Sequence, residues 1–563
     1  MQYQTLVDLY LRLEKTTKRL EKTKFIADFL KTVSQEAIKD VVYLVQGKVF
    51  PPWDERKIGF SSRSMLKVIS VAAGTAVDKV EQLWSKKGDL GIVASELLGK
   101  KSQSTLVKQE LTVQKVINNI RKLATLEGTG TVDKKIWLVA ELLTSASSDE
   151  ARFIVRTVLE ELRVGIAAGI LRDSISQATG HTVEEIEHAA DILADYGEVA
   201  RLAKENKLKS VSLEPGRPLN AMLAILVNNV AQSFEELGTP SQFEYKLDGF
   251  RLQVHKHKDK ILLFTRRMEN VTKQFPEVID YVKKYVKGND FIIDCEAVGF
   301  DPKTGIHLPF QNISQRIKRK YDIAQLAKKL PVEVNVFDTM YYEGKTLMDK
   351  PLSERRALLE KIIKNTPRQL RLTEKLVTDA IEQAQAFYDA SLTKGNEGLM
   401  IKKLDAPYRP GRYVGGWCKL KPVLEPLDLV IVGASYGEGK RAAALSSYVI
   451  ACQDEEGNLL EVGRVSTGVK EKEEEGVTFE ALTKLLKPLI TEVKGRDVIV
   501  KPKIVVEVAY EEVQKSPTYT SGYALRFPRF KRLRVDEKTV DTVNTIDDIE
   551  RIFKVQKGKK PAL

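Results

Sequence analysis

Cysteine and long apolar runs are the clearest absences from this chain. Its 563 residues include three cysteines, Cys295, Cys418 and Cys452, which lie far apart and form no CxxC pair. We therefore expect neither a disulfide framework nor a cysteine-rich zinc site. No apolar run reaches the roughly 18 residues that a membrane-spanning helix needs. Residues 1–10 contain Asp8 and no apolar core, so we do not expect a signal peptide.

Acidic residues are also in deficit. Lys and Arg number 90 against 77 Asp and Glu, giving a net charge of +13, and the five histidines show no recognised metal-binding spacing. An excess of positive charge is typical of proteins that bind a polyanion, although a basic solvated surface has the same composition. Hydrophobic residues at 43% and charged residues at 30% exclude wholesale disorder. The length predicts about two to four domains.

The N-terminal part of the chain has helical periodicity. Apolar residues fall at i, i+3, i+4 and i+7 in its first run, Leu6, Leu9, Tyr10 and Leu13. Thr182 and Glu185 have the spacing of a capping box, which predicts a helix start. Two prolines and a glycine between Ser212 and Pro218 predict a linker. These features predict an all-α domain over residues 1–214.

Strand patterns follow this linker. Phe250, Leu252 and Val254 alternate with polar neighbours, which is the period of a half-buried strand. Similar runs at 291–300, 332–341 and 398–402, interrupted by a helical pattern at 353–364, predict an α/β domain over residues 215–422. Several short strand patterns after 426 predict a small β-barrel over residues 423–563.

The stretch Glu244-Tyr-Lys-Leu-Asp-Gly-Phe-Arg251 carries the most chemical information. As an isolated string it is weak, because Asp-Gly is common in hairpins, and Lys246 alone is most simply a surface lysine. A lysine acts as a nucleophile only when its amine is neutral, and burial and cationic neighbours favour that state. The other strings in the same domain must therefore supply such an environment.

Five further strings recur at strand positions in a fixed order. They are 264–272 (FTRRMENVT), 294–297 (DCEA), 336–338 (VFD), 397–402 (EGLMIK) and 417–421 (WCKLK). Together with 307–311 (HLPFQ) and 350–355 (KPLSER), these strings resemble the motifs of covalent nucleotidyltransferases. The closest resemblance is to the ATP-dependent DNA ligases of archaeal and eukaryotic replicative type. It extends over nearly the whole chain and implies that its barrel is an OB-fold.

The resemblance implies a role for each of these residues. Lys246 is the nucleophile that takes AMP, Glu244 recognises the adenine amino group, and Phe337 stacks on the adenine. Glu296 and Glu397 lie near the ribose and a divalent metal, Mg²⁺ or Mn²⁺, which carboxylates suit better than Zn²⁺. The implied ATP contacts are Glu244, Arg251, Arg266, Glu296, Phe337, Arg412, Lys419 and Lys421.

Each of these residues also has an ordinary structural interpretation. Phe337 could be sheet core, and Glu296 and Glu397 could be salt-bridged acids. Lys419 and Lys421 lie on one face of a strand, as solvent-facing lysines often do. The joint occurrence of the strings, and not any one residue, favours the functional interpretation.

Two other parts of the chain extend the resemblance. The cation-rich string 526–536 (RFPRFKRLRVD) is similar to the family's last motif, which orients the pyrophosphate leaving group, and this implies roles for Arg526, Arg529, Arg532 and Asp536. The N-terminal domain resembles the family's DNA-binding domain. Its implied DNA contacts are Gly128, Gly130, Arg163 and Gly165. Residues 102–107 lie where relatives carry a sliding-clamp peptide, but Gln103, Leu106 and Val107 lack its paired aromatic residues.

The resemblance predicts an ATP-dependent enzyme that seals nicks in duplex DNA during replication, repair and recombination. We expect a cytoplasmic, nucleoid-associated monomer if the source is a prokaryote or an archaeon. Alternatives within the superfamily are an RNA ligase and a capping guanylyltransferase. An alternative of another class is an idle DNA-binding scaffold. A scaffold has no need of Lys246, Glu296, Glu397 and Lys419.

Overall fold

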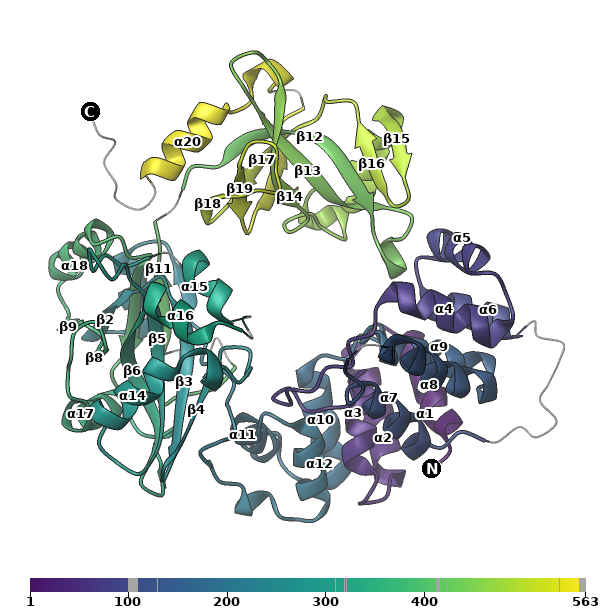
Figure 1. Ribbon diagram of the computed structural model, residues 1–563, viewed down its shortest axis with the longest axis horizontal. Helices are drawn as coiled ribbons and strands as arrows, with labels where there is room; N and C mark the ends of the chain where they lie inside the picture. The colour runs from purple at the N-terminus through teal and green to yellow at the C-terminus, as the bar shows by residue number, and fades with distance from the viewer. Residues whose placement is uncertain are drawn as a thin grey trace. The chain divides into compact units, whose positions relative to one another are not determined.

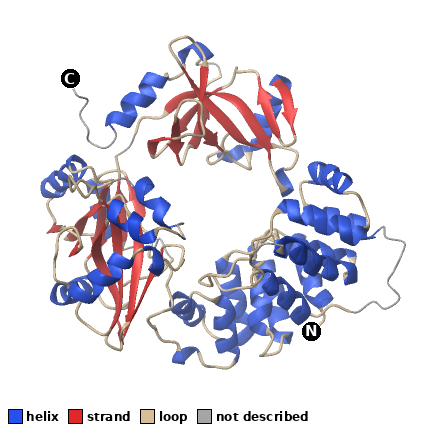
Figure 2. Ribbon diagram, in the orientation of Figure 1, coloured by secondary structure: helices blue, strands red, loops and turns tan. Residues whose placement is uncertain are grey.

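The computed structural model describes residues 1–99, 110–128, 130–308, 310–317, 319, 321–411, 416–422, 424–535 and 537–555. Figure 2 shows helices in the N-terminal part, helices and strands in the central part, and mainly strands in the C-terminal part. The chain divides into two compact units, Met1–Ser61 with Ser104–Lys421 and Ser62–Gln103 with Pro422–Leu563. Within the described residues, no helix is long and apolar enough to cross a membrane.

The N-terminal part is built from helices, as its periodicity predicts (Figure 1). The four apolar residues expected on one face of the first helix are all at most 3% exposed. Thr182 and Glu185 form the predicted capping box at the start of α11. The helices are α1 (Tyr3–Glu14), α2 (Arg19–Thr32), α3 (Ile38–Val45), α4 (Ser62–Ala73), α5 (Val77–Lys87), α6 (Leu90–Gly99), α7 (Val113–Leu123), α8 (Thr131–Ser145), α9 (Ser148–Val158), α10 (Ala168–Thr179), α11 (Val183–Leu193) and α12 (Tyr196–Lys204).

The linker after α12 is docked on the central part of the chain. The Gly216 N–H donates to Nδ1 of His255 at 3.0 Å. Gln253 accepts from the Leu219 N–H at 3.0 Å and donates to the Leu219 carbonyl at 2.9 Å. Burial lowers the pKa of His255 to about 3, so the ring is neutral and its nitrogen can accept. The linker is therefore held by the polar face of one strand.

The central part contains a five-stranded and a six-stranded sheet. The five-stranded sheet has the order β1-β11-β10-β2-β9, and the six-stranded sheet has β4-β3-β5-β6-β7 with β8 beside β6. Their strands are β1 (Ile225–Val227), β2 (Ser241–Lys246), β3 (Phe250–His257), β4 (Lys260–Thr265), β5 (Asp290–Gly299), β6 (Val332–Tyr342), β7 (Lys345–Thr346), β8 (Leu370–Leu372), β9 (Lys375–Thr378), β10 (Gly398–Lys403) and β11 (Trp417–Leu420). The helices of this part are α13 (Val230–Leu237), α14 (Pro276–Tyr285), α15 (Phe310–Ile317), α16 (Ile323–Lys329), α17 (Leu352–Ile362) and α18 (Ile381–Thr393).

Side-chain alternation gives each sheet an apolar face and a polar face. On β2 and β10, Phe243, Leu399 and Ile401 pack in a core with α13 and α18, while Glu244 and Lys246 take the other face. On β3, β5 and β6, apolar residues pack in a second core with α14 and α17. A third cluster includes Phe337 of β6 and Trp417 of β11, so it joins the two sheets by their other faces. Most charged residues of the sequence motifs lie on these facing sides.

A bulge in β6 changes the alternation at Phe337. Asp294 pairs with Asp338 and Cys295 pairs with Val336, which leaves Phe337 as the extra residue on β6. Phe337 packs in the cluster between the sheets and Val336 in the outer core, as alternation predicts for two neighbouring residues. The bulge changes the face of the residues that follow, so Asp338 pairs with Asp294.

Two glycines allow the motif strands to approach each other closely. A Cβ on Gly249, in the connection from β2 to β3, would lie 2.4 Å from the Ala297 carbonyl oxygen of β5. A Cβ on Gly398 would lie 2.0 Å from the Leu420 oxygen, and its φ of +133° is unfavourable for other residues. Gly398 separates Glu397 from the rest of β10, so its close contact with β11 brings Glu397 near Lys421.

The C-terminal part is dominated by a seven-stranded sheet of order β14-β13-β12-β16-β15 with β17 beside β12 and β20 beside β17. Its main core includes Leu429, Ile450 and Val506 and extends to Ile549 of the last helix. The short strands that the patterns after residue 426 predict are present. The elements are β12 (Leu427–Tyr436), β13 (Leu445–Gln453), β14 (Leu459–Val465), α19 (Phe479–Leu486), β15 (Ile490–Lys494), β16 (Asp497–Val500), β17 (Val505–Ala509), β18 (Glu512–Lys515), β19 (Tyr523–Arg526), β20 (Arg529–Leu533) and α20 (Ile546–Val555).

The substitution Gly398→Ala should destabilise the central part, because it combines a disallowed φ with a backbone clash. Gly344→Ala is the matched control, since Gly344 also has a positive φ but nothing within 4 Å of its Cβ position. We expect a loss of about 3 kcal/mol for Gly398→Ala and about 1 kcal/mol for Gly344→Ala. Urea unfolding followed by tryptophan fluorescence measures both, and equal losses would show that the contact with Leu420 costs nothing.

Candidate active site

Lys246 lies at the end of β2 and makes an ion pair with Glu397. Its Nζ is 2.7 Å from Oε2 of Glu397, and Nζ of Lys421 lies 3.2 Å from the same oxygen. The Glu397 N–H also donates to the Lys246 carbonyl at 2.8 Å, which fixes the two backbones together. The side chains of Lys246 and Glu397 are 22% and 16% exposed, so the pair is partly buried but still open to a ligand.

This environment differs from the one expected for Lys246. The sequence predicts burial and cationic neighbours around Lys246, but its direct partner in the structure is the carboxylate of Glu397. The cationic neighbour, Lys421, acts through the shared oxygen. Glu397 is the direct partner of Lys246 because the backbone hydrogen bond between these two residues brings their side chains together.

Two carboxylates at the site have opposite pKa shifts. Burial raises the pKa of Glu296 to about 8, with Lys246 and Arg251 opposing the shift and Glu397 adding to it. Burial also acts to raise the pKa of Glu397, but Lys246 and Lys421 outweigh it and lower that pKa to about 2. At neutral pH Glu397 is therefore ionised and Glu296 is largely protonated. Perturbed pairs of this kind are typical of functional sites.

The two carboxylates have the chemistry of a divalent cation site. Glu397 raises the pKa of Glu296, so the two negative charges oppose each other, and a hard cation between carboxylate oxygens would relieve that repulsion. Within the described residues, no group of three or more His, Cys, Asp or Glu side chains is arranged to hold a metal. A cation at this site would therefore complete its ligand shell with atoms of another molecule.

Glu244 is buried on the same strand, two residues before Lys246. It is 2% exposed, and its Oε2 lies 2.7 Å from Nζ of Lys402, which is 1% exposed. Its Oε1 accepts from Nε2 of Gln242 at 2.6 Å. Burial lowers the pKa of Lys402, and Glu244 opposes that shift. The family resemblance assigns Glu244 to recognition of the adenine amino group. In the structure its carboxylate accepts hydrogen bonds from Gln242 and Lys402.

An aromatic cluster lies beside this ion pair. Nζ of Lys402 is 4.5 Å from the ring centroid of Phe337 and 4.6 Å from that of Trp417. The two rings meet edge to face, with centroids 5.9 Å apart. Lys402 therefore connects Phe337, which the resemblance assigns to base stacking, with Glu244, which the resemblance assigns to base recognition.

Arg251 is committed to a buried carboxylate. Its guanidinium binds Asp294 through two nitrogens, at 3.0 and 2.6 Å, and donates to the Met222 carbonyl at 2.6 Å. The Tyr408 hydroxyl donates to the same Asp294 at 2.8 Å. Arg251 also lies 5.4 Å from the Phe337 centroid. Arg251 is thus fixed at the edge of the aromatic cluster.

The remaining predicted residues of the central part are less enclosed. Lys419 is partly buried on β11, opposite Met400, so it shares the polar face with Glu244 and Lys421. Arg266 is exposed in the turn after β4. Arg412 lies outside the described residues. The structure therefore brings together Glu244, Lys246, Arg251, Glu296, Phe337, Glu397, Lys419 and Lys421.

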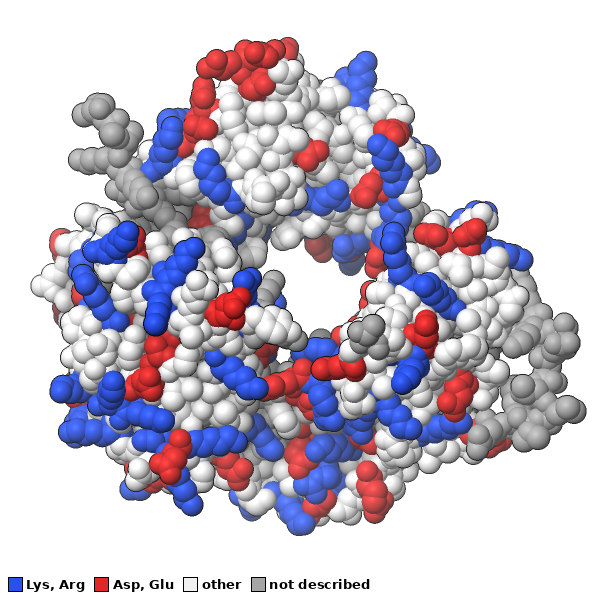
Figure 3. Space-filling model, viewed as in Figure 1, with Lys and Arg blue, Asp and Glu red and all other residues white. Residues whose placement is uncertain are grey.

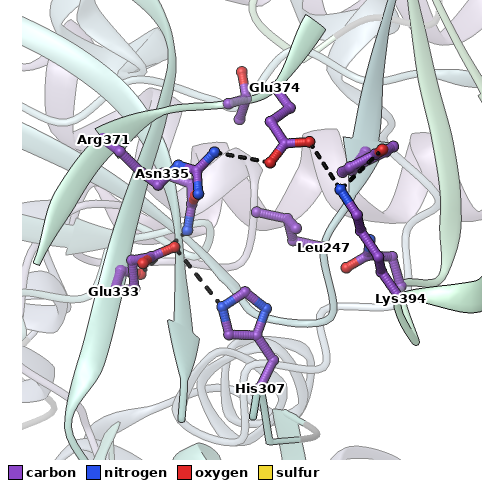
Figure 4. Close-up of a pocket in the computed structure, with 10 residues that line it drawn as sticks. Leu247, His307, Glu333, Asn335, Arg371, Glu374 and Lys394 are labelled. Atoms are coloured by element: carbon purple, nitrogen blue, oxygen red, sulfur yellow. Dashed lines mark hydrogen bonds and ion pairs between the residues drawn. The ribbon is translucent and has the colours of Figure 1, made fainter. Parts of the chain in front are cut away.

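A small polar pocket lies at the end of β2 (Figure 4). His307 and Glu333 face each other across it at 3.7 Å, and Glu374 binds both Arg371, at 3.0 Å, and Lys394, at 3.1 Å. Its lining also includes Tyr245, Leu247 and Asn396, which adjoin the motif residues in sequence. The charged side chains that line this pocket form ion pairs with one another. The pocket therefore borders the site but offers no unbalanced charge to a ligand.

Two of the predicted arginines of the C-terminal part, Arg526 and Arg532, are paired with acids of the same part. Arg526 binds Glu512 at 3.0 Å, and Arg532 binds Glu507 at 3.0 Å and Glu537 at 2.9 Å. Arg529 is exposed at the start of β20. Asp536 lies outside the described residues.

The N-terminal residues predicted to contact DNA lie in two turns. Gly128 and Gly130 have φ of +99° and +78°, with nothing near their Cβ positions, and Gly130 precedes α8. Gly165 also has a positive φ, +66°, and the buried Lys22 donates to its carbonyl at 3.1 Å. Arg163 forms an ion pair with Glu161. The clamp-peptide residues Gln103, Leu106 and Val107 lie outside the described residues.

Positive and negative side chains share the face of the molecule shown in Figure 3, where Lys and Arg side chains lie among Asp and Glu side chains.

Sequence analysis overlooked three polar residues of the site. Asp294, Lys402 and Tyr408 have no assigned role in the sequence motifs, yet they are 0%, 1% and 0% exposed and bind Arg251 or Glu244. A detectable signal existed for Lys402, since it lies at an even spacing from Met400 on an otherwise apolar strand and so shares the face of Glu244.

Family comparisons cover each part of the chain. The family model described as DNA ligase N terminus matches residues 2–176, the model described as ATP dependent DNA ligase domain matches 221–421, and the model described as ATP dependent DNA ligase C terminal region matches 441–537. All three models describe DNA ligases, and the central and C-terminal models specify ATP-dependent DNA ligases. They follow the order of the helical, mixed and strand-rich parts.

Curated relatives match nearly the whole length of the chain. The DNA ligase of Nanoarchaeum equitans is 49% identical over 566 residues, covering 99% of both chains. The DNA ligase of Thermococcus onnurineus is 42% identical over 556 residues, covering 98% of this chain and 97% of its own. The chain belongs to the ATP-dependent DNA ligases, of the archaeal type. The solved structure titled Pmar-Lig_PreS3 has a TM-score of 0.57 at 18% identity, covering 94% of this chain and 99% of its own, and shares the fold.

The pKa of Glu296 predicts a change in stability with pH. Because its folded value of about 8 exceeds the ordinary value of 4.5, the folded protein holds an extra proton between these pH values and loses stability as the pH rises through them. Glu296→Gln cannot titrate. Its urea midpoint, compared with that of the wild type, should therefore be more favourable at about pH 8 than at about pH 5. The control is Glu354→Gln on α17, at a side chain that is 58% exposed. A difference between Glu296→Gln and wild type that is the same at both pH values would contradict the assignment.

Proposed function

We propose that this DNA ligase seals nicks in duplex DNA through a covalent Lys246–AMP intermediate. The observation that carries the proposal is the cluster in which Glu397 binds both Lys246 and Lys421 on the polar face between the two central sheets. One amine is placed to attack, a second cation is within reach of phosphate, and a carboxylate couples them. A catalytically idle scaffold would have no use for this arrangement.

The first step is enzyme adenylation. Nζ of Lys246 forms a bond to the α-phosphorus of ATP, the bond to the bridging oxygen breaks, and pyrophosphate leaves with that electron pair. The amine must lose its proton, and Glu397, with a pKa of about 2, is a poor base for it. The role that fits Glu397 is to hold Lys246 until the carboxylate is drawn to another cation, which then favours the neutral amine.

The second and third steps transfer AMP to DNA and release it. The 5′-phosphate oxygen at a nick displaces Lys246 from AMP, and the 3′-hydroxyl oxygen then attacks that 5′-phosphorus and expels AMP. Each step is an in-line displacement, so alignment and charge stabilisation supply most of the catalysis. Lys419 and Lys421 lie on the face where they can offset phosphate charge.

Mg²⁺, with Mn²⁺ as a substitute, is the proposed metal, and Glu296 and Glu397 are the residues that would hold it. A divalent cation there supplies charge neutralisation to the polyphosphate. Because Glu296 is protonated up to a pKa of about 8, metal binding must displace its proton.

We place the domain boundaries at residues 1–214, 215–422 and 423–563, and assign the last domain to the OB-fold. The division between compact units at Lys421 and the family-model match ending at 421 support the second boundary. The strand-rich sheet and its apolar core support a barrel. The arginines of this domain, Arg526, Arg529 and Arg532, with Asp536, act in the first step by orienting the pyrophosphate.

DNA contacts are proposed to fall mainly on the phosphate backbone. Gly128, Gly130, Arg163 and Gly165 all have positive φ, and glycine backbone can approach a phosphate closely. Binding should then be salt-sensitive and largely independent of sequence. We also propose that the protein acts as a cytoplasmic, nucleoid-associated monomer in replication, repair and recombination. A contact between residues 103–107 and a sliding clamp is supported by sequence position alone.

Lys246→Ala should abolish covalent labelling by α-labelled ATP. Wild-type protein incubated with Mg²⁺ and no DNA should retain label on a denaturing gel and release it when nicked duplex is added. Lys260→Ala, at an exposed lysine of the same domain, is the control and should label normally. Label that persists on Lys246→Ala would end the proposed mechanism, and label from GTP alone would favour a capping enzyme.

Arg529→Ala should slow enzyme adenylation and spare the later steps. Loss of one positioned cation is expected to reduce the rate of labelling by about 100-fold. Sealing of a nick that already carries 5′-adenylate should remain close to wild type, because pyrophosphate is absent from that step. Lys531→Ala, an exposed neighbour on β20, is the control. Equal loss in both assays would assign Arg529 to DNA binding instead.

A further inference from the structure

The carboxylate of Glu244 has a cationic neighbour that comes from a helix and not from the strands of its own sheet. Besides Lys402 and Gln242, Nη1 of Arg356 lies 3.8 Å from its Oε1. Arg356 comes from α17, directly after the string 350–355, and is 4% exposed. No sequence motif assigns it a role. A buried arginine directed at a buried carboxylate on another element must be explained by what that carboxylate does.

Arg356 is itself fixed by several contacts. Its Nη1 donates to Oγ1 of Thr373 at 2.9 Å and its Nη2 to the Thr373 carbonyl at 2.7 Å, and its Nε lies 3.3 Å from Glu360. The Thr373 N–H donates to the Val336 carbonyl at 3.0 Å. Since Val336 precedes Phe337, Arg356 connects Glu244 on one sheet to the aromatic residue on the other.

The charge of Glu244 decides which purine it can accept. An ionised carboxylate only accepts hydrogen bonds, whereas a protonated one can also donate. The 6-amino group of adenine donates, and O6 of guanine only accepts. With Lys402, Arg356 and Gln242 around it, the Glu244 carboxylate offers acceptor oxygens, which match the amino group of adenine and not O6 of guanine at the same position.

We propose that Arg356 is a positioning residue for base selection, which holds Glu244, together with Lys402 and Gln242, as a fixed anionic acceptor that admits a 6-amino purine and rejects a 6-oxo purine. This inference rests on the proposed function, because it takes Glu244 to face the base of the nucleotide that labels Lys246. Arg356 touches neither the nucleotide nor the reacting atoms. Its effect is on the ratio of two nucleotides and not on the chemistry of transfer.

The test compares labelling of the full-length protein by α-labelled ATP and α-labelled GTP. For Arg356→Met we expect the preference for ATP over GTP, as the ratio of kcat/KM values, to fall by about 10-fold, mainly through KM. Arg356→Lys should restore part of the preference, because it keeps a cation near Glu244. Lys361→Met, an exposed lysine on the same helix, is the matched control and should keep the wild-type ratio.

A second variant covers the case in which Arg356→Met does not fold, as judged by circular dichroism. Glu244→Gln keeps the shape of the side chain but adds a donor, so it should label with GTP relatively better than the wild type does. An unchanged ATP to GTP ratio in a folded Arg356→Met, or in Glu244→Gln, would overturn the inference while leaving the ligase mechanism intact. Absence of label from ATP on the wild-type protein would instead overturn the proposed function.

Discussion

The contact between Lys246 and Glu397 is the interaction on which the rest of the site depends. It joins the end of β2 to the start of β10 through both a backbone hydrogen bond and an ion pair. Gly398 makes the contact possible, because only a residue without Cβ can approach Leu420 so closely. With these two strands in register, Glu244, Lys402 and Lys421 fall on the same side of the sheet by simple alternation.

The second sheet completes the site through residues that are themselves fixed. Asp294 holds Arg251, and Phe337 packs between the sheets against Trp417. These are buried charges with partners, which cost little only while the partners remain. The site is therefore fully buried at Glu244 and Lys402, where we propose that the base binds, and less enclosed at Lys246 and Lys421, where we propose that phosphates enter. That gradient suits a reaction in which the base stays bound while the phosphates exchange partners.

The strands and the motif residues could be predicted from the sequence, but the side chains that bind those residues could not. Period-two patterns were sufficient for β3, β5 and β6, because one face of each strand is apolar and the other polar. Lys402 and Asp294 lie within the motif strings, and the spacing of Lys402 indicates its face of the strand, yet nothing local shows that either side chain is buried. Arg356 lies beyond such reasoning, since its contact with Glu244 spans two elements and depends on tertiary packing. The acid partner of Lys246 was likewise not predicted, because strand pairing and not sequence distance brings it there.

The docking of the linker on β3 gives that strand two separate duties. Arg251 serves the site, while Gln253 and His255, two and four residues further along the same face, hold the peptide between Gly216 and Leu219. For anyone who wishes to graft or shorten this enzyme, the segment after α12 is thus part of the catalytic domain's surface and not a free tether. A cut made after Leu219 would strip the covering from a buried imidazole and amide, whereas a cut near the end of α12 would leave that cover in place.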